Sequence, residues 1–176
     1  MDSAKKLTIE ERIELHRRMA EGYRDAYATQ GVSDGGGYES WKFADDALYS
    51  SPYFIGEEVL TLRETSIQWA ESAAMEAKAY SLKFPDWKPK EFKCWPADNG
   101  FVMRTRWEGH TKEGVKMGFY SIGFVDTNDE GLITRWETFV NDDEYGPFLE
   151  VALGVRGPFK GKDQYHEALT KALAAA

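Results

Sequence analysis

The sequence predicts an α+β fold, in which a curved antiparallel sheet wraps around a long N-terminal helix and further helices. Three observations predict it: a helical pattern over residues 8–29, a second helix-rich stretch over 57–81, and three long strands with tight turns within 101–141. A strongly curved sheet that packs on one long helix leaves a cone with an open mouth, which is a natural ligand pocket.

The first helix has both a start signal and an apolar stripe. Thr8 and Glu11 stand three residues apart in TIEE, which is the pattern of a capping box at a helix N-terminus. The residues that recur at helical spacing are Ile9, Ile13, Ala20, Tyr23 and Tyr27. We therefore expect an amphipathic helix over residues 8–29, followed by a glycine-rich loop over 31–37.

The segment before the second helix carries weaker signals. Residues 38–44 are expected to form a short helix, and residues 47–54 a strand that Pro52 disturbs. Side chains alternate across a strand, so this segment places Tyr49 and Ser51 on one side of it.

The rest of the chain predicts a four-stranded antiparallel meander followed by helices. The expected strands cover residues 91–97, 101–108, 115–126 and 132–141, the first two joined by the hairpin signal Asp98-Asn99-Gly100. A helical turn or short helix over 142–154 and a C-terminal helix over 163–176 complete the chain. We expect one domain over residues 1–176, with a core of about 8–145 and a C-terminal helical extension over 146–176.

The strands of the meander carry ionisable and aromatic side chains at alternate positions. Arg104, Arg106 and Glu108 share one face of their strand, and Glu137 and Asn141 share one face of the last strand. Neither face of the sheet is cleanly apolar. This pattern is expected when one side lines a cavity with polar groups and a partner partly covers the other side.

Composition restricts the possible functions. The net charge of −8 argues against nucleic acid and against an anionic membrane surface, because both need a basic patch. Cys94 is the single cysteine, so no intrachain disulfide or cysteine metal cage is expected. No apolar run approaches the length of a membrane span, and the polar N-terminal residues lack a signal-peptide core, so we expect a cytoplasmic protein. The high aromatic content suits either a ligand-lined cavity or a densely filled core.

With these segments in place, the sequence resembles the SnoaL-like branch of the nuclear-transport-factor-2-like superfamily of cone-shaped α+β barrels. The resemblance covers roughly residues 8–145. It depends on the N-terminal helix, on FADDALYSSPYFIGEEVL leading into a helix, and on the ending DTNDEGLITRWETFVND. This superfamily includes dehydratases, isomerases, cyclases, epoxide hydrolases and proteins without catalysis, so the fold does not determine the function.

The resemblance implies roles for individual positions. Tyr49 and Ser51 match the place of a hydrogen-bonding tyrosine and its polar partner, and Arg104 and Arg106 lie on the strand that supplies an inward ion pair in the epoxide-hydrolase relatives. Asn141 stands where those relatives have an acid that acts as base. Asparagine does not take up a proton at neutral pH, so the epoxide-hydrolase mechanism is in doubt here.

Residue chemistry makes Glu137 the first candidate for an acid or base. If its face lines the cone, apolar neighbours raise its pKa and a nearby arginine lowers it. The alternative is a structural Arg–Glu pair. Tyr49 is expected to donate a proton or hold an oxyanion, unless it is an ordinary core tyrosine. Arg104 is the expected oxyanion support, with Arg106 and Lys116 as alternatives.

Aromatic and polar residues are expected to line the substrate site, with core packing as the alternative role for several of them. These candidates are Tyr23, Tyr27, Trp41, Ser51, Trp69, Arg106, Lys116, Tyr120 and Phe139. His16, His110 and His166 have no metal-ligand spacing and are expected to be surface or turn histidines, so no metal or other cofactor is expected.

The sequence analysis therefore predicts a cofactor-independent lyase for a medium-sized hydroxylated aromatic small molecule. The reaction is expected to be dehydration or carbon–carbon cleavage, as in lyases that release formaldehyde from lignin-derived diarylpropanes, which the chain resembles in its aromatic load. An isomerase or hydrolase acting on a similar ligand, and a non-catalytic binding or interaction module, remain alternatives. Trp107, Trp136 and Val140 are expected to form an apolar outer sheet face that makes a homo-oligomer.

Overall fold

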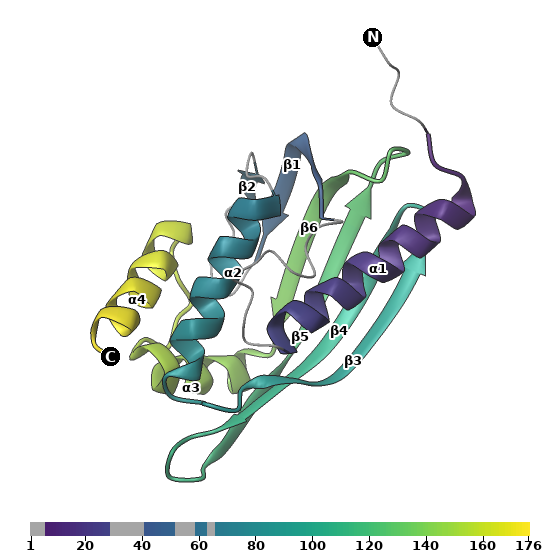
Figure 1. Cartoon of the computed structure of the whole chain (residues 1–176). Coiled ribbons are helices and arrows are strands. Elements are labelled where there is room, and N and C mark those ends of the chain that lie inside the picture. Colours follow the sequence, from purple (N-terminus) through teal and green to yellow (C-terminus); the bar gives the residue numbers. More distant parts are fainter. Residues whose placement is uncertain (1–5, 29–40, 52–58, 63–65) are drawn as a thin grey trace.

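The computed structural model describes residues 6–28, 41–51, 59–62 and 66–176, with the backbone alone for 59–62, 66–72 and 162. The helices of this part of the chain are α1 (Ile9–Ala28), α2 (Ser66–Ser81), α3 (Asp142–Leu153) and α4 (Lys162–Ala174). The strands are β1 (Phe43–Ser50), β2 (Val59–Leu62), β3 (Lys88–Ala97), β4 (Gly100–His110), β5 (Lys116–Thr127) and β6 (Ile133–Val140). Figure 1 shows their arrangement, with the start of α1 and the end of α4 at opposite ends of the molecule.

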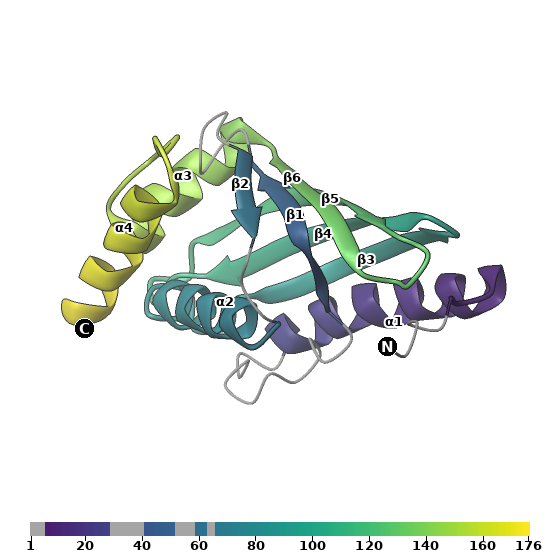
Figure 2. The ribbon, with the colours of Figure 1, turned by 90° about the horizontal axis from the view of Figure 1, so that it is seen from above.

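The strands form one sheet in the order β2-β1-β6-β5-β4-β3. β3, β4, β5 and β6 pair antiparallel in sequence order, which confirms the predicted meander, whereas β1 pairs parallel with β6. Figure 2 shows α1 and α2 on one side of the curved sheet and α3 and α4 at one end of it. The described chain is thus an α+β fold with a mixed sheet.

The two faces of the sheet differ sharply in burial. The inner face, toward α1 and α2, carries buried side chains that include Thr105, Trp107, Phe119, Val125 and Trp136. The outer face carries their alternating neighbours, Arg104, Arg106, Tyr120, Phe124 and Glu137. Two strand pairs fix this assignment, since Trp107 lies opposite Phe119 and Trp136 lies opposite Val125.

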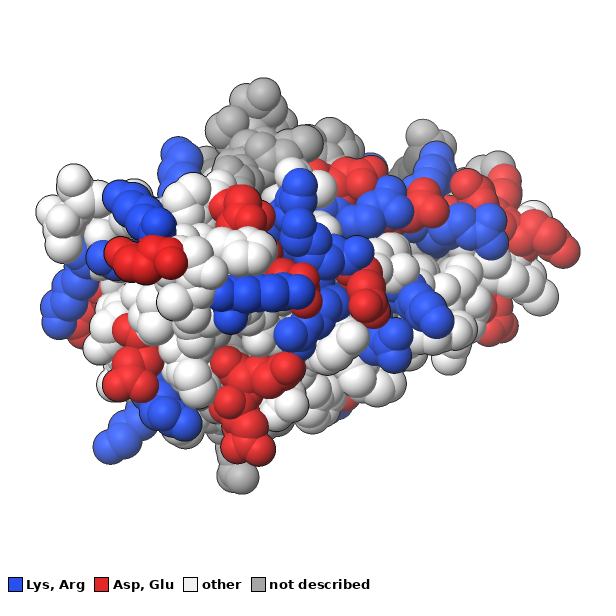
Figure 3. All heavy atoms as spheres, turned by 90° about the horizontal axis from the view of Figure 1, so that it is seen from below, with Lys and Arg blue, Asp and Glu red and all other residues white. Residues whose placement is uncertain are grey.

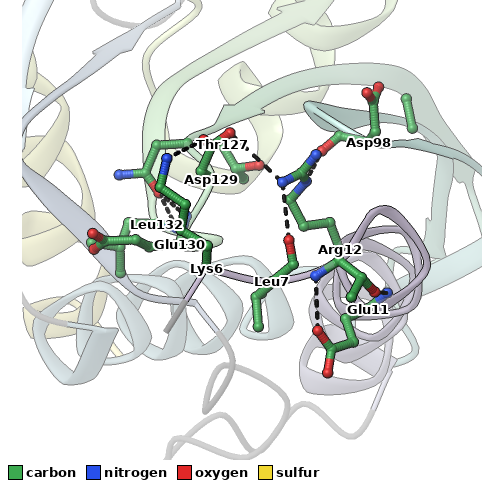
Figure 4. A network of polar contacts seen from close by, with 12 residues as sticks. Lys6, Leu7, Glu11, Arg12, Asp98, Thr127, Asp129, Glu130 and Leu132 are labelled. Carbon is green, nitrogen blue, oxygen red and sulfur yellow. Dashed lines mark hydrogen bonds and ion pairs between the residues drawn. The ribbon is translucent and has the colours of Figure 1, made fainter. Parts of the chain in front are cut away.

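The start of α1 follows the sequence prediction closely. The Thr8 amide donates to Glu11 Oε2 over 2.8 Å, and the Glu11 amide donates to Thr8 Oγ1 over 3.2 Å, so the predicted capping box is formed. Arg12 donates to the Asp98 carbonyl over 2.8 Å, and Lys6 pairs with Asp129 over 3.1 Å (Figure 4). These contacts tie the start of α1 to the turns after β3 and β5.

His16 lies further along α1 and is fully buried, so the prediction of a surface or turn histidine is wrong for it. Its Nδ1 donates to the Ala97 carbonyl over 2.7 Å, and its Nε2 accepts from the Thr127 hydroxyl over 2.7 Å in the neutral ring. Burial lowers the pKa of His16 below its ordinary value. The helix needs this side chain neutral to join the ends of β3 and β5.

Two secondary-structure predictions before α2 are wrong. Strand β1 begins at Phe43, inside the segment expected to be a short helix, and Val59–Leu62 is strand β2 rather than part of a helix that starts at residue 57. β2 pairs antiparallel with β1, and this pairing outweighs the helical preference of its surroundings. The loop predicted for 31–37 and the strand residues Pro52 and Tyr53 lie outside the described residues.

The core on the inner face is mainly aromatic. Trp41, Trp87, Trp107 and Trp136 are at most 2% exposed, and Trp87 stacks on Trp107 with ring centroids 4.9 Å apart. The prediction that Trp107, Trp136 and Val140 form the outer face is therefore wrong, because all three belong to the alternating set that points inward. None of the described helices has the length and apolarity that a membrane crossing requires.

Candidate active site

Four tyrosine hydroxyls gather around one carboxyl group on the helical side of the sheet. Tyr165 donates to Glu76 Oε2 over 2.5 Å and Tyr27 donates to Glu76 Oε1 over 3.2 Å. The Tyr80 hydroxyl lies 2.8 Å from that of Tyr165 and 2.8 Å from that of Tyr145. We call these five residues the Glu76 cluster.

The cluster joins all four helices. Glu76 and Tyr80 stand four residues apart on α2, so they lie on the same side of that helix. Tyr27 comes from the last turn of α1, Tyr145 from the first turns of α3 and Tyr165 from the first turn of α4. Segments that are distant in sequence thus converge at this one carboxyl group.

Glu76 as a whole residue is partly exposed, whereas the four tyrosines of the cluster are buried. Burial of its carboxyl raises the pKa of Glu76, and the donors Tyr165 and Tyr27 oppose this rise by stabilising the carboxylate. Among the described residues no lysine, arginine or histidine forms an ion pair with Glu76. Burial therefore favours the protonated form of this acid, while the two phenol donors favour its ionised form.

Among the predicted catalytic residues, Tyr49 lies on the same inner side of the sheet as this arrangement. It is 6% exposed on the inner side of β1, and its ring lies 5.4 Å from that of Trp136. Burial raises the pKa of Tyr49, and the charge of Glu76 adds to the rise, while a hydrogen bond with Thr138 lowers it. Tyr49 therefore stays a protonated phenol at neutral pH and can act as a hydrogen-bond donor.

Aromatic rings continue from the Glu76 cluster along the inner face. The Tyr27 ring lies 5.0 Å from that of Trp107, and the Tyr23 ring lies 6.0 Å from that of Trp136. Trp41 packs on Trp136 at 4.6 Å. The structure thus brings the predicted lining residues Tyr23, Tyr27, Trp41 and Ser51 together with Tyr49 on the inner side.

Glu137 does not belong to this group, and the prediction that its face lines the cone is wrong. β6 pairs with β5 so that Glu137 lies opposite Phe124, whose ring is 44% exposed on the outer face. Glu137 accepts a hydrogen bond from Arg135 over 2.6 Å and one from Ser50 over 3.4 Å. The alternative interpretation of an Arg–Glu pair describes this contact in its partner, Arg135, but the pair is partly exposed and not buried as that interpretation expected.

Arg104, Arg106, Lys116 and Tyr120 also lie away from the inner side, so their predicted place in the site is wrong. Arg106 forms ion pairs with Glu144 over 2.8 Å and with Glu108 over 3.2 Å, and Lys116 pairs with Glu108 over 2.8 Å. The hydrogen bond from Lys116 is the main cause that lowers the pKa of Glu108. The guanidinium groups of Arg104 and Arg106 both approach the Tyr120 ring.

The remaining candidates have other positions. Asn141 caps α3, because its Oδ1 accepts from the Asp143 amide over 3.1 Å. Phe139 is 41% exposed on the outer face, next to Phe124. Trp69 belongs to α2, but its side chain lies outside the described part.

Sequence reasoning missed Glu76, Tyr80, Tyr145 and Tyr165. One local signal could have found the first two: AAMEAKAYS places an acid and a tyrosine four residues apart among alanines, on the side of α2 that carries the buried Ala73 and Ala77. The contributions of α3 and α4 carry no such signal, because they depend on how the C-terminal helices dock.

Charged side chains of both signs mix on the face that Figure 3 shows. Within the described part of the chain, no three His, Cys, Asp or Glu side chains come close enough to hold a metal ion. The Glu76 cluster combines one carboxyl group with phenols, and groups of these types can transfer protons.

No protein-family model matches this chain, and no curated protein matches it. A putative isomerase from Bacillus subtilis matches in structure with a TM-score of 0.51 and 16% sequence identity, over 81% of this chain and 95% of that one. An NTF2-like protein of unknown function from Cytophaga hutchinsonii has a TM-score of 0.48 and 12% identity, over 73% and 97% of the two chains. A phenazine biosynthesis-related protein from Pseudomonas aeruginosa has a TM-score of 0.48 and 18% identity, over 89% and 97%. The predicted α+β fold is confirmed, and likeness at these identities shows the fold alone.

Proposed function

We propose that the protein is a cofactor-independent acid–base enzyme for a small hydroxylated aromatic molecule, with Glu76 as its acid or base. One observation carries this proposal: a single carboxyl group accepts hydrogen bonds from two tyrosines within a buried cluster. A carboxyl whose pKa is raised by burial is a stronger proton acceptor than an ordinary glutamate, and its acid form persists to higher pH. This proposal transfers to Glu76 the role that the sequence favoured for Glu137.

The reaction that we propose is a lyase reaction. In a dehydration, ionised Glu76 takes a proton from a carbon atom, the neighbouring C–O bond breaks, and the leaving hydroxyl departs as water with a proton from a phenol such as Tyr49. In carbon–carbon cleavage, Glu76 takes the proton of a hydroxymethyl group, formaldehyde leaves, and a proton returns to the remaining carbanion. Both steps balance without an oxidant, a reductant or a metal.

An isomerase is the second candidate function, because the same groups support it. A carboxylate that removes a proton from one carbon and returns it to another needs only a nearby donor to hold the enolate oxygen. Tyr49 is such a donor, since burial keeps it protonated. Turnover without loss of water or formaldehyde distinguishes an isomerase from a lyase.

The aromatic inner side supports an aromatic substrate. Tyr23, Tyr27 and Trp41 continue from the Glu76 cluster as rings in contact with one another, and Tyr23 is the partly exposed one among them. The experiment is a turnover assay with synthetic 1,2-diaryl-1,3-propanediols, which follows formaldehyde colorimetrically and new conjugated double bonds by ultraviolet absorbance. Product formation that Glu76→Gln abolishes supports the proposal. Binding without any product supports the non-catalytic module instead and contradicts the enzyme.

We further propose that the outer face joins two copies of this chain. Trp95, Phe124 and Phe139 are 51%, 44% and 41% exposed there, and the Phe124 and Phe139 rings contact each other edge to face. Lys93 lies opposite Arg104, whereas Glu137 lies opposite Phe124, so cationic and acidic groups flank the same rings. A two-fold axis through this face would bury the rings and set opposite charges against each other.

A further inference from the structure

Helix α4 supplies the Tyr165 hydroxyl of the Glu76 cluster. No other described element places a hydroxyl at that position. α4 is the C-terminal helix of the described chain, and Phe159 and Leu169, which lie just before it and within it, are at most 2% exposed. The helix is therefore packed into the molecule by its own apolar side chains. Its first turn then holds Tyr165 at 2.5 Å from the Glu76 carboxyl.

The hydroxyls form an ordered chain that ends at this carboxyl. Each phenol has one proton, so when Tyr165 donates to Glu76 its oxygen is left to accept from Tyr80. Tyr80 has then used its own proton, and its oxygen accepts from Tyr145. The Tyr145 hydroxyl also hydrogen-bonds with that of Tyr165, so its proton goes either to Tyr80 or directly to Tyr165. In both arrangements the donations run from α3 toward the carboxylate.

A directed chain of this kind stabilises the ionised carboxyl more than a single donor does. Each hydroxyl that donates becomes a better acceptor for the previous one, so the bonds strengthen one another. This row of hydrogen bonds also holds the Tyr165 side chain in one orientation, because the oxygen and the proton of its hydroxyl are both engaged. Tyr165 in turn holds Glu76 at one position between the four helices.

We propose that Tyr165 is a positioning residue for Glu76, and that α4 completes the candidate active site by placing this phenol on the carboxyl. The Tyr80 hydroxyl hydrogen-bonds to that of Tyr165, and the Tyr145 hydroxyl hydrogen-bonds to that of Tyr80. Both residues therefore help to fix the orientation of Tyr165. The inference rests on the proposed function in one respect, the role of Glu76 as the acid or base, but the contact itself can be measured without a substrate.

The test is a pH titration of the Glu76 carboxyl in the full-length chain by difference infrared spectroscopy. The carbonyl band of the protonated acid is assigned by its loss in Glu76→Gln. Tyr165→Phe removes one hydroxyl and keeps the ring, so we expect the midpoint of this band to move to higher pH, because the carboxylate loses its shorter hydrogen bond. Tyr80→Phe should move it in the same direction by less, and Tyr145→Phe should move it least.

This graded order separates positioning from a merely structural role, which would lower the melting temperature without ordering the three midpoints. An unchanged midpoint in Tyr165→Phe, in a protein with wild-type circular dichroism, overturns the inference. If Tyr165→Phe fails to fold, Tyr80→Phe gives the deciding measurement, since an unmoved midpoint there overturns the directed chain. The diaryl-diol assay is independent: an absent activity removes the proposed function, while the infrared shifts still decide the role of Tyr165.

Discussion

Two glutamates of this chain show how surroundings decide the chemistry of one side-chain type. Glu137 lies on the outer face beside the guanidinium group of Arg135, at 2.6 Å. Glu76 lies among phenols, where burial raises its pKa. A carboxyl whose pKa is raised by burial is suited to acid–base work, and a carboxyl paired with an arginine is suited to a structural role.

The sequence could not decide between these two residues. Alternation along β6 was predictable, but which of its two sets of side chains faces inward depends on register, and a shift of one residue exchanges them. Tyr49, Tyr23 and Trp41 lie on the inner side among the core rings, and their role in a substrate site stays a prediction. Glu76 was not identified as a candidate from the sequence, because the tyrosines around it come in part from three other helices.

His16 gives a prediction about stability and pH. Its folded-state pKa is lowered, so the unfolded chain takes up the proton first as the pH falls. The free energy of unfolding should therefore be highest above about pH 6.5, the ordinary histidine value, and should fall as the pH drops from there toward the folded pKa. Urea unfolding at a series of pH values measures this dependence.

The comparison that isolates His16 uses two variants. His16→Gln should lose stability at pH 8 and show a weaker fall between pH 7 and 5, because it lacks the titrating ring. His166→Gln, on α4, should keep the wild-type slope. A His16→Gln slope equal to that of the wild type would show that His16 is not the source of the acid sensitivity.

At the scale of elements, the start of a helix and a tight turn between strands were easier to predict than the pairing of distant strands. The capping box of α1 and the hairpin between β3 and β4 depend on residues next to each other in sequence, and both formed as expected. β2 depends on pairing with β1, and its four residues carried no local sign of that partner. Local interactions are encoded in neighbouring residues, whereas strand pairing depends on the whole fold.

Asn141 is an element-scale feature, and its substitution tests that assignment. Asn141→Ala should lower the free energy of unfolding by about 1 kcal/mol, because the Asp143 amide at the start of α3 loses its acceptor. Asn141→Asp keeps a good N-cap and should be close to the wild type. Neither change should alter kcat for an active substrate, and a large kcat loss in Asn141→Ala at unchanged stability would restore the catalytic role that the sequence suggested.

At the scale of the whole molecule, the inner side of the sheet is filled by helices and rings, and the outer face is left with exposed aromatic side chains. The association of two copies through that face is tested by sedimentation velocity. Phe139→Lys adds a cation near Arg104 and should shift the protein toward the monomer. Val115→Lys is the matched control, since Val115 is 56% exposed but lies in the turn before β5. Equal sedimentation of both variants and the wild type would argue against an interface on the outer face.

The candidate active site also belongs to the whole molecule, since α1, α2, α3 and α4 each supply part of it. A raised pKa at Glu76 predicts that kcat/KM of a base-catalysed reaction rises with pH through a value above that of an ordinary glutamate, because the carboxyl must first ionise. Tyr165→Phe should move this rise of kcat/KM to higher pH.

The most direct measurement is kcat of the purified protein and of two matched variants on a diaryl diol that the wild type converts. Glu76→Gln should lower kcat by about 10²- to 10⁴-fold, the usual contribution of a general acid or base. Glu137→Gln, the same change on the outer face, should leave kcat near the wild-type value. The reverse order, with Glu137→Gln inactive and Glu76→Gln active, would contradict the assignment of the site to the helical side of the sheet.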